Sequence, residues 1–196
     1  MAKLLYQGHG SFRIRTDGGA AAYVDPYAGG GYDVPADLIL VTHGHYDHIR
    51  VDLCARKPGC RVITNEEALA GGRHNRFDLN WIIVEAVEAK NLFHSPKKCV
   101  GYLLTTDGVK LYASGDTSKT KQMESFAALG LDYALFCGDG KFNMGLKEAA
   151  ECAALVGAKH NIMIHVKPGE LFDRKRAEKW AAPNKLMIEP GQEISL

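Results

Sequence analysis

The 196-residue sequence predicts a layered α/β domain, and three observations carry this prediction. The first third contains short apolar segments separated by turns rich in Gly and Asp, which is typical of strands. The last third alternates apolar segments with segments that keep helical spacing. No repeat or linker divides the chain, so we expect one domain over residues 1–196. Strands that come first and then alternate with helices favour sheets with helices packed on them.

The composition narrows the class of protein further. Hydrophobic residues make up 46% and charged residues 24%, as in ordinary globular domains. A net charge of +1 gives no strong field, so we expect neither a nucleic-acid nor a membrane partner. No signal peptide or membrane span is visible, and five cysteines without a Cys-x-x-Cys pair fit reduced thiols. The expected location is therefore cytoplasmic.

The strands of the first half follow one another closely. They are expected at 4–6, 12–15, 21–24, 38–41, 61–64 and 81–87. Gly8-His9-Gly10 and Asp17-Gly18-Gly19 supply the first two turns. Residues 38–41 are apolar at every position, which predicts a strand covered on both faces. Residues 100–105 and 109–113 predict a hairpin around Asp107-Gly108.

Three helices are expected in the second half. The first lies around residues 123–130, with Thr117 or Ser118 as a candidate N-cap. The second, between 146 and 157, has one face of mostly small residues suited to close packing on a sheet, formed by Leu146, Ala149, Ala150, Ala153, Ala154 and Gly157. The third runs from about 170 to 180. Late strands are expected at 133–136, 161–164 and 186–188.

Three apolar strands each lead to a polar residue that could bind metal. Residues 38–41 precede His43, residues 111–113 precede Asp116, and residues 162–164 precede His165. In layered α/β folds, sites gather outside the carboxyl ends of strands. We therefore expect these three strand ends to converge, although 122 positions separate His43 from His165.

The stretch "VTHGHYDH" at 41–48 carries the strongest chemical signal. His43, His45, Asp47 and His48 give the pattern H-x-H-x-D-H directly after an apolar strand. Imidazole and carboxylate groups suit zinc or manganese. The alternative is a solvated polar loop. Histidine is rare, so three in six positions favour a metal site.

This motif resembles that of the metallo-β-lactamase superfamily, and the resemblance covers nearly the whole chain. Further matching segments, in order, are "VDPY" (24–27), "AKNLFHSPKKCVGYLLTTDGVKLYASGDT" (89–117), "KFNMGLKEAA" (141–150) and "NIMIH" (161–165). The resemblance implies a four-layer αβ/βα sandwich in a single domain. It is nearest to the compact, lactonase-like hydrolases, a branch that includes L-ascorbate-6-phosphate lactonase.

The resemblance also implies two divalent metal ions, zinc or manganese, with iron also compatible. His43, His45 and His94 would hold the first ion, Asp47, His48 and His165 the second, and Asp116 would bridge them. Taken singly, three of these residues are also compatible with ordinary structural roles. His94 could be a surface-loop residue, Asp116 a helix cap, and His165 a strand-end histidine.

The implied reaction is hydrolysis of a small ester, lactone or phosphoester by a hydroxide that bridges the metals. Asp47 would be both ligand and catalytic group, orienting the nucleophile. His9, in the turn Gly-His-Gly-Ser, would contact substrate or protonate the leaving group, unless it is a plain surface turn. Asp25 would hold an imidazole, unless it only forms an Asp-Pro turn.

Two features leave the substrate undefined. Lys167 follows the last histidine where many relatives have an aromatic residue, and Asp139 lies where relatives tend to have small residues. We expect a small-molecule substrate, with an anionic one and a homo-oligomer left open. The alternatives are a metal-binding protein of this fold without hydrolytic turnover, or a phosphodiesterase or nuclease-type relative.

Overall fold

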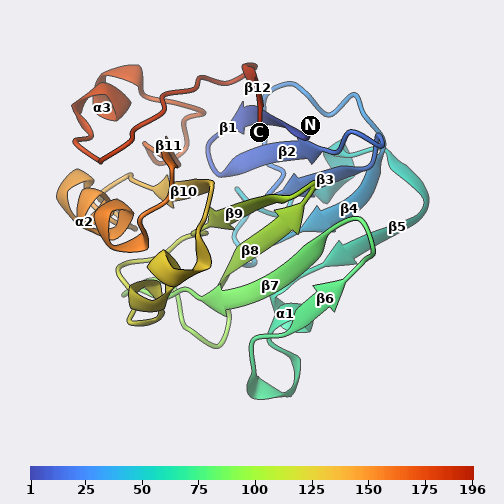
Figure 1. Ribbon diagram of the computed structural model, residues 1–196, viewed down its shortest axis with the longest axis horizontal. Helices are drawn as coiled ribbons and strands as arrows, with labels where there is room; N and C mark the ends of the chain where they lie inside the picture. Colours follow the sequence, from blue (N-terminus) through green and yellow to red (C-terminus); the bar gives the residue numbers. More distant parts are fainter.

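The computed structural model describes residues 1–196 and contains two six-stranded sheets that face each other (Figure 1). The first sheet has the order β12 (Glu193–Ser195), β1 (Lys3–Gly8), β2 (Ser11–Arg15), β3 (Ala21–Val24), β4 (Ala36–Leu40) and β5 (Arg56–Ile63). The second has the order β11 (His160–Ile164), β10 (Tyr133–Cys137), β9 (Val109–Ala113), β8 (Val100–Thr106), β7 (Ile83–Glu88) and β6 (Arg76–Asp78). Both sheets are mixed, because β3, β4 and β5 run parallel, as do β9, β10 and β11.

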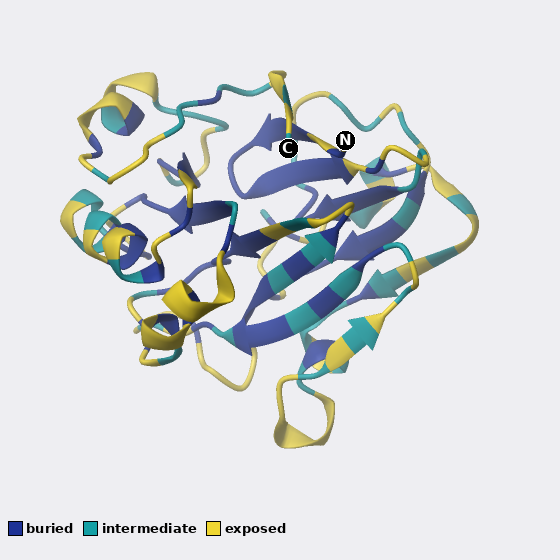
Figure 2. Cartoon of the chain, viewed as in Figure 1, coloured by how far each residue is buried: buried dark blue, intermediate teal, exposed yellow.

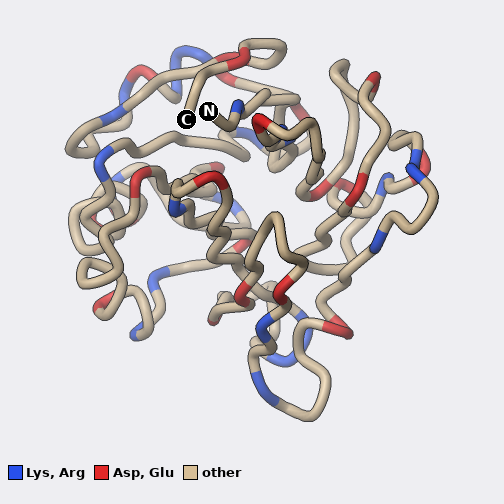
Figure 3. The backbone as a smooth tube through the Cα atoms, turned by 45° about the vertical axis from the view of Figure 1, so that its right-hand side comes forward, with Lys and Arg blue, Asp and Glu red and all other residues tan.

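The helices are short and few. They are α1 (Asn65–Ala68), α2 (Leu146–Val156) and α3 (Arg174–Lys179), with 3₁₀ turns η1 (Val51–Leu53), η2 (Ala70–Gly72) and η3 (Gln122–Leu129). None of them combines the length and the apolar character needed to cross a membrane. All five cysteines are free, as expected. Acidic and basic residues are interspersed over the backbone without forming a face of one sign in the view of Figure 3.

Two cores hold the layers together, and their positions confirm the predicted αβ/βα sandwich. The larger core lies between the sheets, where β4 contributes Leu38 and Leu40. The second lies between the outer face of the second sheet and α2, η3 and α3. The outer face of the first sheet is covered only thinly, by η1 and nearby loops over Tyr23 and Ile39. Figure 2 shows the buried strands inside a shell of exposed turns and helix faces.

Helix α2 packs through small side chains, but its buried face differs from the predicted one. Ala149 and Ala153 are buried as expected, whereas Cys152 and Val156 complete the face and Ala154 is exposed. Gly157 ends the helix in the left-handed conformation, with φ 66°. This conformation suits glycine because it has no Cβ to clash.

Several predicted elements are wrong, for local reasons. Residues 186–188 form no strand, and only an isolated bridge from Asn161 to Lys185 marks this region. The segment around 123–130 is a 3₁₀ helix that begins after Lys121 and has no side-chain cap, so neither Thr117 nor Ser118 caps it. β6 and β12 were not predicted, because each has only three residues and pairs at a sheet edge.

Candidate metal centre

The predicted convergence of strand ends is confirmed. The carboxyl ends of β4, β9 and β11 lead to His43, Asp116 and His165, and these side chains meet where the two sheets adjoin. The backbone N–H of Val100 donates to the carbonyl of Thr42 over 3.0 Å, which joins the sheets beside the site. Parallel strands point their carboxyl ends to one edge, and this is why distant segments gather there.

The seven side chains expected to bind metal lie together, and their binding of metal stays a prediction. These side chains form three groups, and within each group the candidate ligand atoms all lie within 4.8 Å of one another. The groups are His43, His45 and His94; Asp47, His48 and His165 together with His9; and His43, His48 and Asp116. The first two groups contain the two sets that the resemblance implied, and the third connects them through Asp116.

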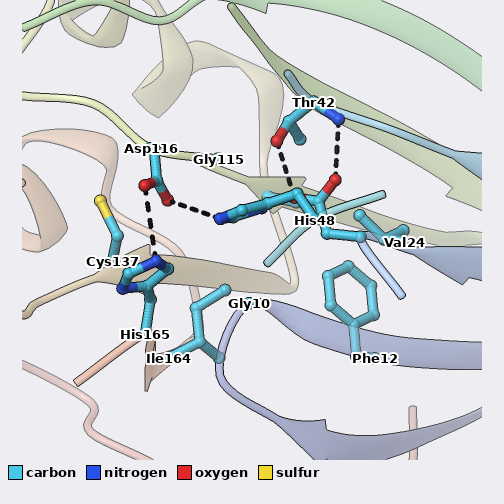
Figure 4. A pocket seen from close by; sticks show the side chains of 12 residues that line it. Gly10, Phe12, Val24, Thr42, His48, Gly115, Asp116, Cys137, Ile164 and His165 are labelled. Atoms are coloured by element: carbon cyan, nitrogen blue, oxygen red, sulfur yellow. Dashed lines mark hydrogen bonds and ion pairs between the residues drawn. The ribbon is translucent and has the colours of Figure 1, made fainter. Parts of the chain in front are cut away.

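Asp116 lies at the centre of this arrangement, next to His43 and His94 of the first set and to His48 and His165 of the second. Figure 4 shows its carboxylate between His48 and His165. Its Oδ2 is 3.5 Å from His94 Nε2 and 3.4 Å from His165 Nε2. Its Oδ1 is 3.6 Å from His48 Nε2. The side chain is only 5% exposed, so the carboxylate faces the imidazoles instead of water. This position fits the bridging role expected of it.

Four of the imidazoles are held from behind by oxygen atoms. His48 Nδ1 donates to Asp25 Oδ2 over 2.8 Å, and His94 Nδ1 donates to Asn91 Oδ1 over 2.8 Å. His43 Nδ1 is 3.1 Å from Thr42 Oγ1, and His165 Nδ1 is 3.3 Å from Asp139 Oδ2. The hydrogen bonds of His43, His48 and His94 fix the tautomer and direct the opposite nitrogen, Nε2, into the cluster, whereas His165 is only within ion-pair distance of Asp139. The expected contact between Asp25 and an imidazole is therefore present.

The residues fit a metal centre. Nε2 of His43, His48 and His165 is buried and has no hydrogen-bond partner. A buried polar atom without a partner costs free energy unless something binds it. Imidazole lone pairs next to carboxylates are the donors that zinc and manganese take.

The charges in the cluster are strongly coupled. Burial, together with the neighbouring His48, lowers the pKa of His43 to about 2, although Asp116 opposes this shift. Burial also lowers the pKa of His48, but the carboxylates of Asp116 and Asp25 outweigh it and raise that pKa to about 9. Burial raises the pKa of Asp116, but the charges of His165, His48 and His43 bring it well below its ordinary value. Asp116 therefore stays a carboxylate.

His9 lies behind Asp47 and not in the open part of the site. Its side chain is fully buried. Nε2 is 3.0 Å from Asp47 Oδ2, and Nδ1 is 2.9 Å from the carbonyl oxygen of Glu170. The ring also packs against that of His165 at a tilt, with 3.7 Å between ring centres and 42° between ring planes. The turn Gly8–Gly10 thus brings His9 against the carboxylate of the motif, and its predicted catalytic role stays a prediction.

Three non-glycine residues of the site have left-handed backbones. These are His9 (φ 55°), Asp25 (φ 45°) and His165 (φ 48°). This conformation costs free energy in residues with a Cβ and persists where surrounding contacts enforce it. One such contact is the hydrogen bond from the His165 N–H to the His9 carbonyl, 2.7 Å long. The backbone is therefore held in place at the cluster.

Asn143 was not predicted, although it contacts the centre of the site. Its Nδ2 donates to Asp116 Oδ2 over 2.8 Å and to Asp139 Oδ2 over 2.7 Å. The one signal for it in the sequence is its place inside the matching segment 141–150, and that segment does not distinguish Asn143 from its neighbours.

The two residues that left the substrate undefined lie apart from the open site. Asp139 is buried and accepts backbone N–H groups from its own loop, so it neither lines the open site nor pairs with the Lys141 side chain. Lys167 is exposed and pairs with Glu170. Asp139 therefore contacts the cluster through His165, which is one of the candidate ligands, and through Asn143, which donates to Asp116.

A two-sheet αβ/βα sandwich with histidines and aspartates gathered at its strand ends defines a class of metallohydrolases. The chain belongs to the metallo-β-lactamase superfamily, since the family model described as the beta-lactamase superfamily domain matches residues 3–165. Within it, the chain is similar to the UPF0173 metal-dependent hydrolase of Pyrococcus furiosus, with 30% identity over the full length of both chains. It is 31% identical to the UPF0173 metal-dependent hydrolase of Myxococcus xanthus, over 83% of this chain and 70% of that one.

Comparison with solved structures supports the same family assignment. A crystal structure from Parabacteroides distasonis, described as a metal-dependent hydrolase, is 25% identical and has a TM-score of 0.77 over 96% of this chain and 93% of that one. These likenesses confirm the prediction of a metal-dependent hydrolase at the level of the family.

Proposed function

We propose that the protein hydrolyses a small lactone or ester at a centre of two divalent cations, zinc or manganese, as the lactonase-like branch does. The observation that carries this proposal is the position of Asp116 between two sets of imidazoles, several of whose inward nitrogens lack partners. His43, His45 and His94 would hold one cation, and Asp47, His48 and His165 the other. Bound cations supply activation of water at neutral pH and polarisation of the scissile oxygen.

The chain's own residues would orient the reactants. In hydrolysis, the acyl carbon gains the oxygen of water, its bond to the leaving oxygen breaks, and the leaving oxygen takes a proton. Asp47 is 15% exposed and borders the open cleft over the site, so its carboxylate can orient the attacking water. The hydrogen bond from His9 and the charge of His48 lower the pKa of Asp47 although burial opposes them. Asp47 is thus held as a carboxylate at neutral pH.

A substrate panel on metal-loaded protein tests this function. Zinc- and manganese-loaded protein should hydrolyse γ-valerolactone or simple acetate esters, and removal of metal by a chelator should abolish the activity until metal is restored. Bis(p-nitrophenyl) phosphate tests the phosphoester alternative. Metal content measured by plasma mass spectrometry should approach two ions per chain. Bound metal without turnover on any of these compounds would contradict the proposal.

His9 is proposed as a positioning residue for Asp47. His9→Asn removes the ring atom that contacts Asp47, while asparagine tolerates the left-handed backbone at this position. We expect kcat to fall about 10–100-fold with KM changed less than about twofold, as for other groups that orient a ligand. His9→Gln, which can still reach Asp47, should recover part of kcat. An unchanged kcat in His9→Asn would show that the ring only fills space.

A further inference from the structure

A cleft of about 560 Å³ opens directly over the candidate metal centre. Its floor contains five of the candidate ligands, namely His45, Asp47, His94, Asp116 and His165. Its walls are formed mainly by Tyr46, Phe93, Phe142 and Pro168. This volume is typical of small-molecule sites, which combine apolar walls with a few polar groups.

Exposed aromatic side chains concentrate at this cleft. The chain exposes seven large apolar side chains, and three of them line the cleft: Tyr46 (68% exposed), Phe93 (57%) and Phe142 (37%). A fourth, Leu92, immediately precedes Phe93. Single exposed apolar residues need no explanation, but aromatic side chains gathered around reactive groups indicate a binding surface.

Phe93 and Phe142 form a defined pair. Their ring centres are 5.3 Å apart and their planes meet at 85°, an edge-to-face arrangement. A third aromatic ring can add to such a pair by offset stacking or by a further edge-to-face contact. The ammonium group of Lys141 lies over the Phe142 ring, 5.0 Å from its centre, and both rings of the pair line the cleft.

Hydrogen bonds join the loops that carry the two rings to each other and to the candidate metal centre. Asn91 Nδ2 donates to Asn143 Oδ1 over 2.8 Å, which joins the loop of Phe93 to the loop of Phe142. Asn91 also accepts from His94 Nδ1, and Asn143 donates to Asp116. Each ring therefore adjoins a residue that contacts the metal cluster, and its position relative to the reacting groups is fixed.

From this geometry we infer that Phe93 and Phe142 select the substrate by binding a planar apolar group, such as a phenyl ring, next to the scissile bond. The inference rests on the proposed hydrolytic function. Exposed rings gain free energy when a ligand covers them, and the floor of the same cleft is the reactive centre. A second cavity, of about 730 Å³, approaches the same histidines from the side of Lys97 and Lys98 and would select anionic groups.

Two matched lactones test the selection. γ-Phenyl-γ-butyrolactone and γ-valerolactone share one scissile bond and differ in a phenyl or methyl substituent. On zinc-loaded wild type, kcat/KM should be about tenfold higher for the phenyl compound, as burial of part of a ring predicts. In Phe93→Ala and Phe142→Ala this ratio should fall to about one to three, mainly through a higher KM for the phenyl lactone. Leu129→Ala is the matched control, because Leu129 is as exposed as Phe142 (37%) and lies away from the cleft.

A binding measurement separates this inference from the proposed function. Calorimetric titration of zinc-loaded protein should show phenylacetate binding about tenfold more tightly than acetate, as burial of part of a ring predicts. The preference should vanish in the Phe93→Ala/Phe142→Ala double variant. If no substrate is turned over but this preference is found, the proposed function fails and the aromatic site stands.

Three results would overturn the inference. One is turnover with equal kcat/KM for both lactones and no effect of either substitution on the ratio. Another is a preference for a carboxylate-bearing lactone that is lost in Lys97→Ala, which would assign selection to the second cavity. The third is conversion of a wild-type oligomer to a monomer by the phenylalanine substitutions, with selectivity unchanged, which would make the pair an interface between copies.

Discussion

Asp116→Ala should lose one of the two proposed metal ions and lower kcat/KM about 10³-fold or more, while the protein stays folded. Asp116 is the one carboxylate within 4.0 Å of imidazoles from both proposed sets, so its loss removes the only group that can join them. Stabilisation of charge by a pair of metal ions accounts for several kcal/mol of a reaction barrier, and a loss of about 4 kcal/mol corresponds to about 10³-fold.

The measurements are metal content by plasma mass spectrometry, kcat/KM on γ-valerolactone, and far-ultraviolet circular dichroism for the fold. Asp52→Ala serves as the control, because Asp52 is an exposed aspartate whose side chain pairs only with Arg50. The control should keep full metal content and activity. If Asp116→Ala kept two ions and wild-type activity, the bridging assignment would be wrong.

Gly115→Ala should destabilise the protein by about 2–4 kcal/mol and displace Asp116 from the cluster, because a left-handed backbone costs roughly 1–2 kcal/mol in alanine and overpacking typically about 1–3 kcal/mol. Gly115 has φ 58°, and a Cβ there would lie 2.6 Å from the carbonyl oxygen of Val100 and 3.2 Å from Thr42. The close approach matters because Gly115 precedes Asp116 and Thr42 precedes His43.

Thermal unfolding measures this effect. About 2–4 kcal/mol in a chain of this size corresponds to a Tm lower by roughly 5–15 °C. Gly30→Ala is the matched control, since an added Cβ at Gly30 would meet nothing within 4 Å and its φ is not positive. Equal Tm values for the two variants would show that the loop can move aside, and that close packing at Gly115 does not place Asp116.

The two predictions rest on different parts of the molecule. Asp116→Ala concerns the chemistry of the donor set, whereas Gly115→Ala concerns the packing that brings two strand ends together. Measuring both metal content and Tm in each variant separates the chemical effect from the packing effect. Asp116→Ala should change metal content with little change in fold, and Gly115→Ala should change both.

The sequence by itself determined most of the strands, the turns between the early strands and the motif of the site. Residues 38–41 are apolar at every position, and residues 38–40 form the C-terminal part of β4. Asp107-Gly108 makes the predicted hairpin between β8 and β9. The H-x-H-x-D-H pattern predicted a metal site from residue types and spacing alone. Such features depend on neighbours a few positions apart, so they can be seen in one stretch of sequence.

Only the tertiary structure decided what surrounds the candidate ligands. His9 contacts Asp47 across 38 positions, and Asn91 contacts Asn143 across 52. The pairing of Phe93 with Phe142 likewise depends on how the second sheet brings together the loops after β7 and β10. No local period encodes these contacts, because they form only when loops that follow distant strands of one sheet are brought to the same edge. The physical reason is that spacing specifies secondary structure, whereas the outer contacts of a site depend on long-range packing.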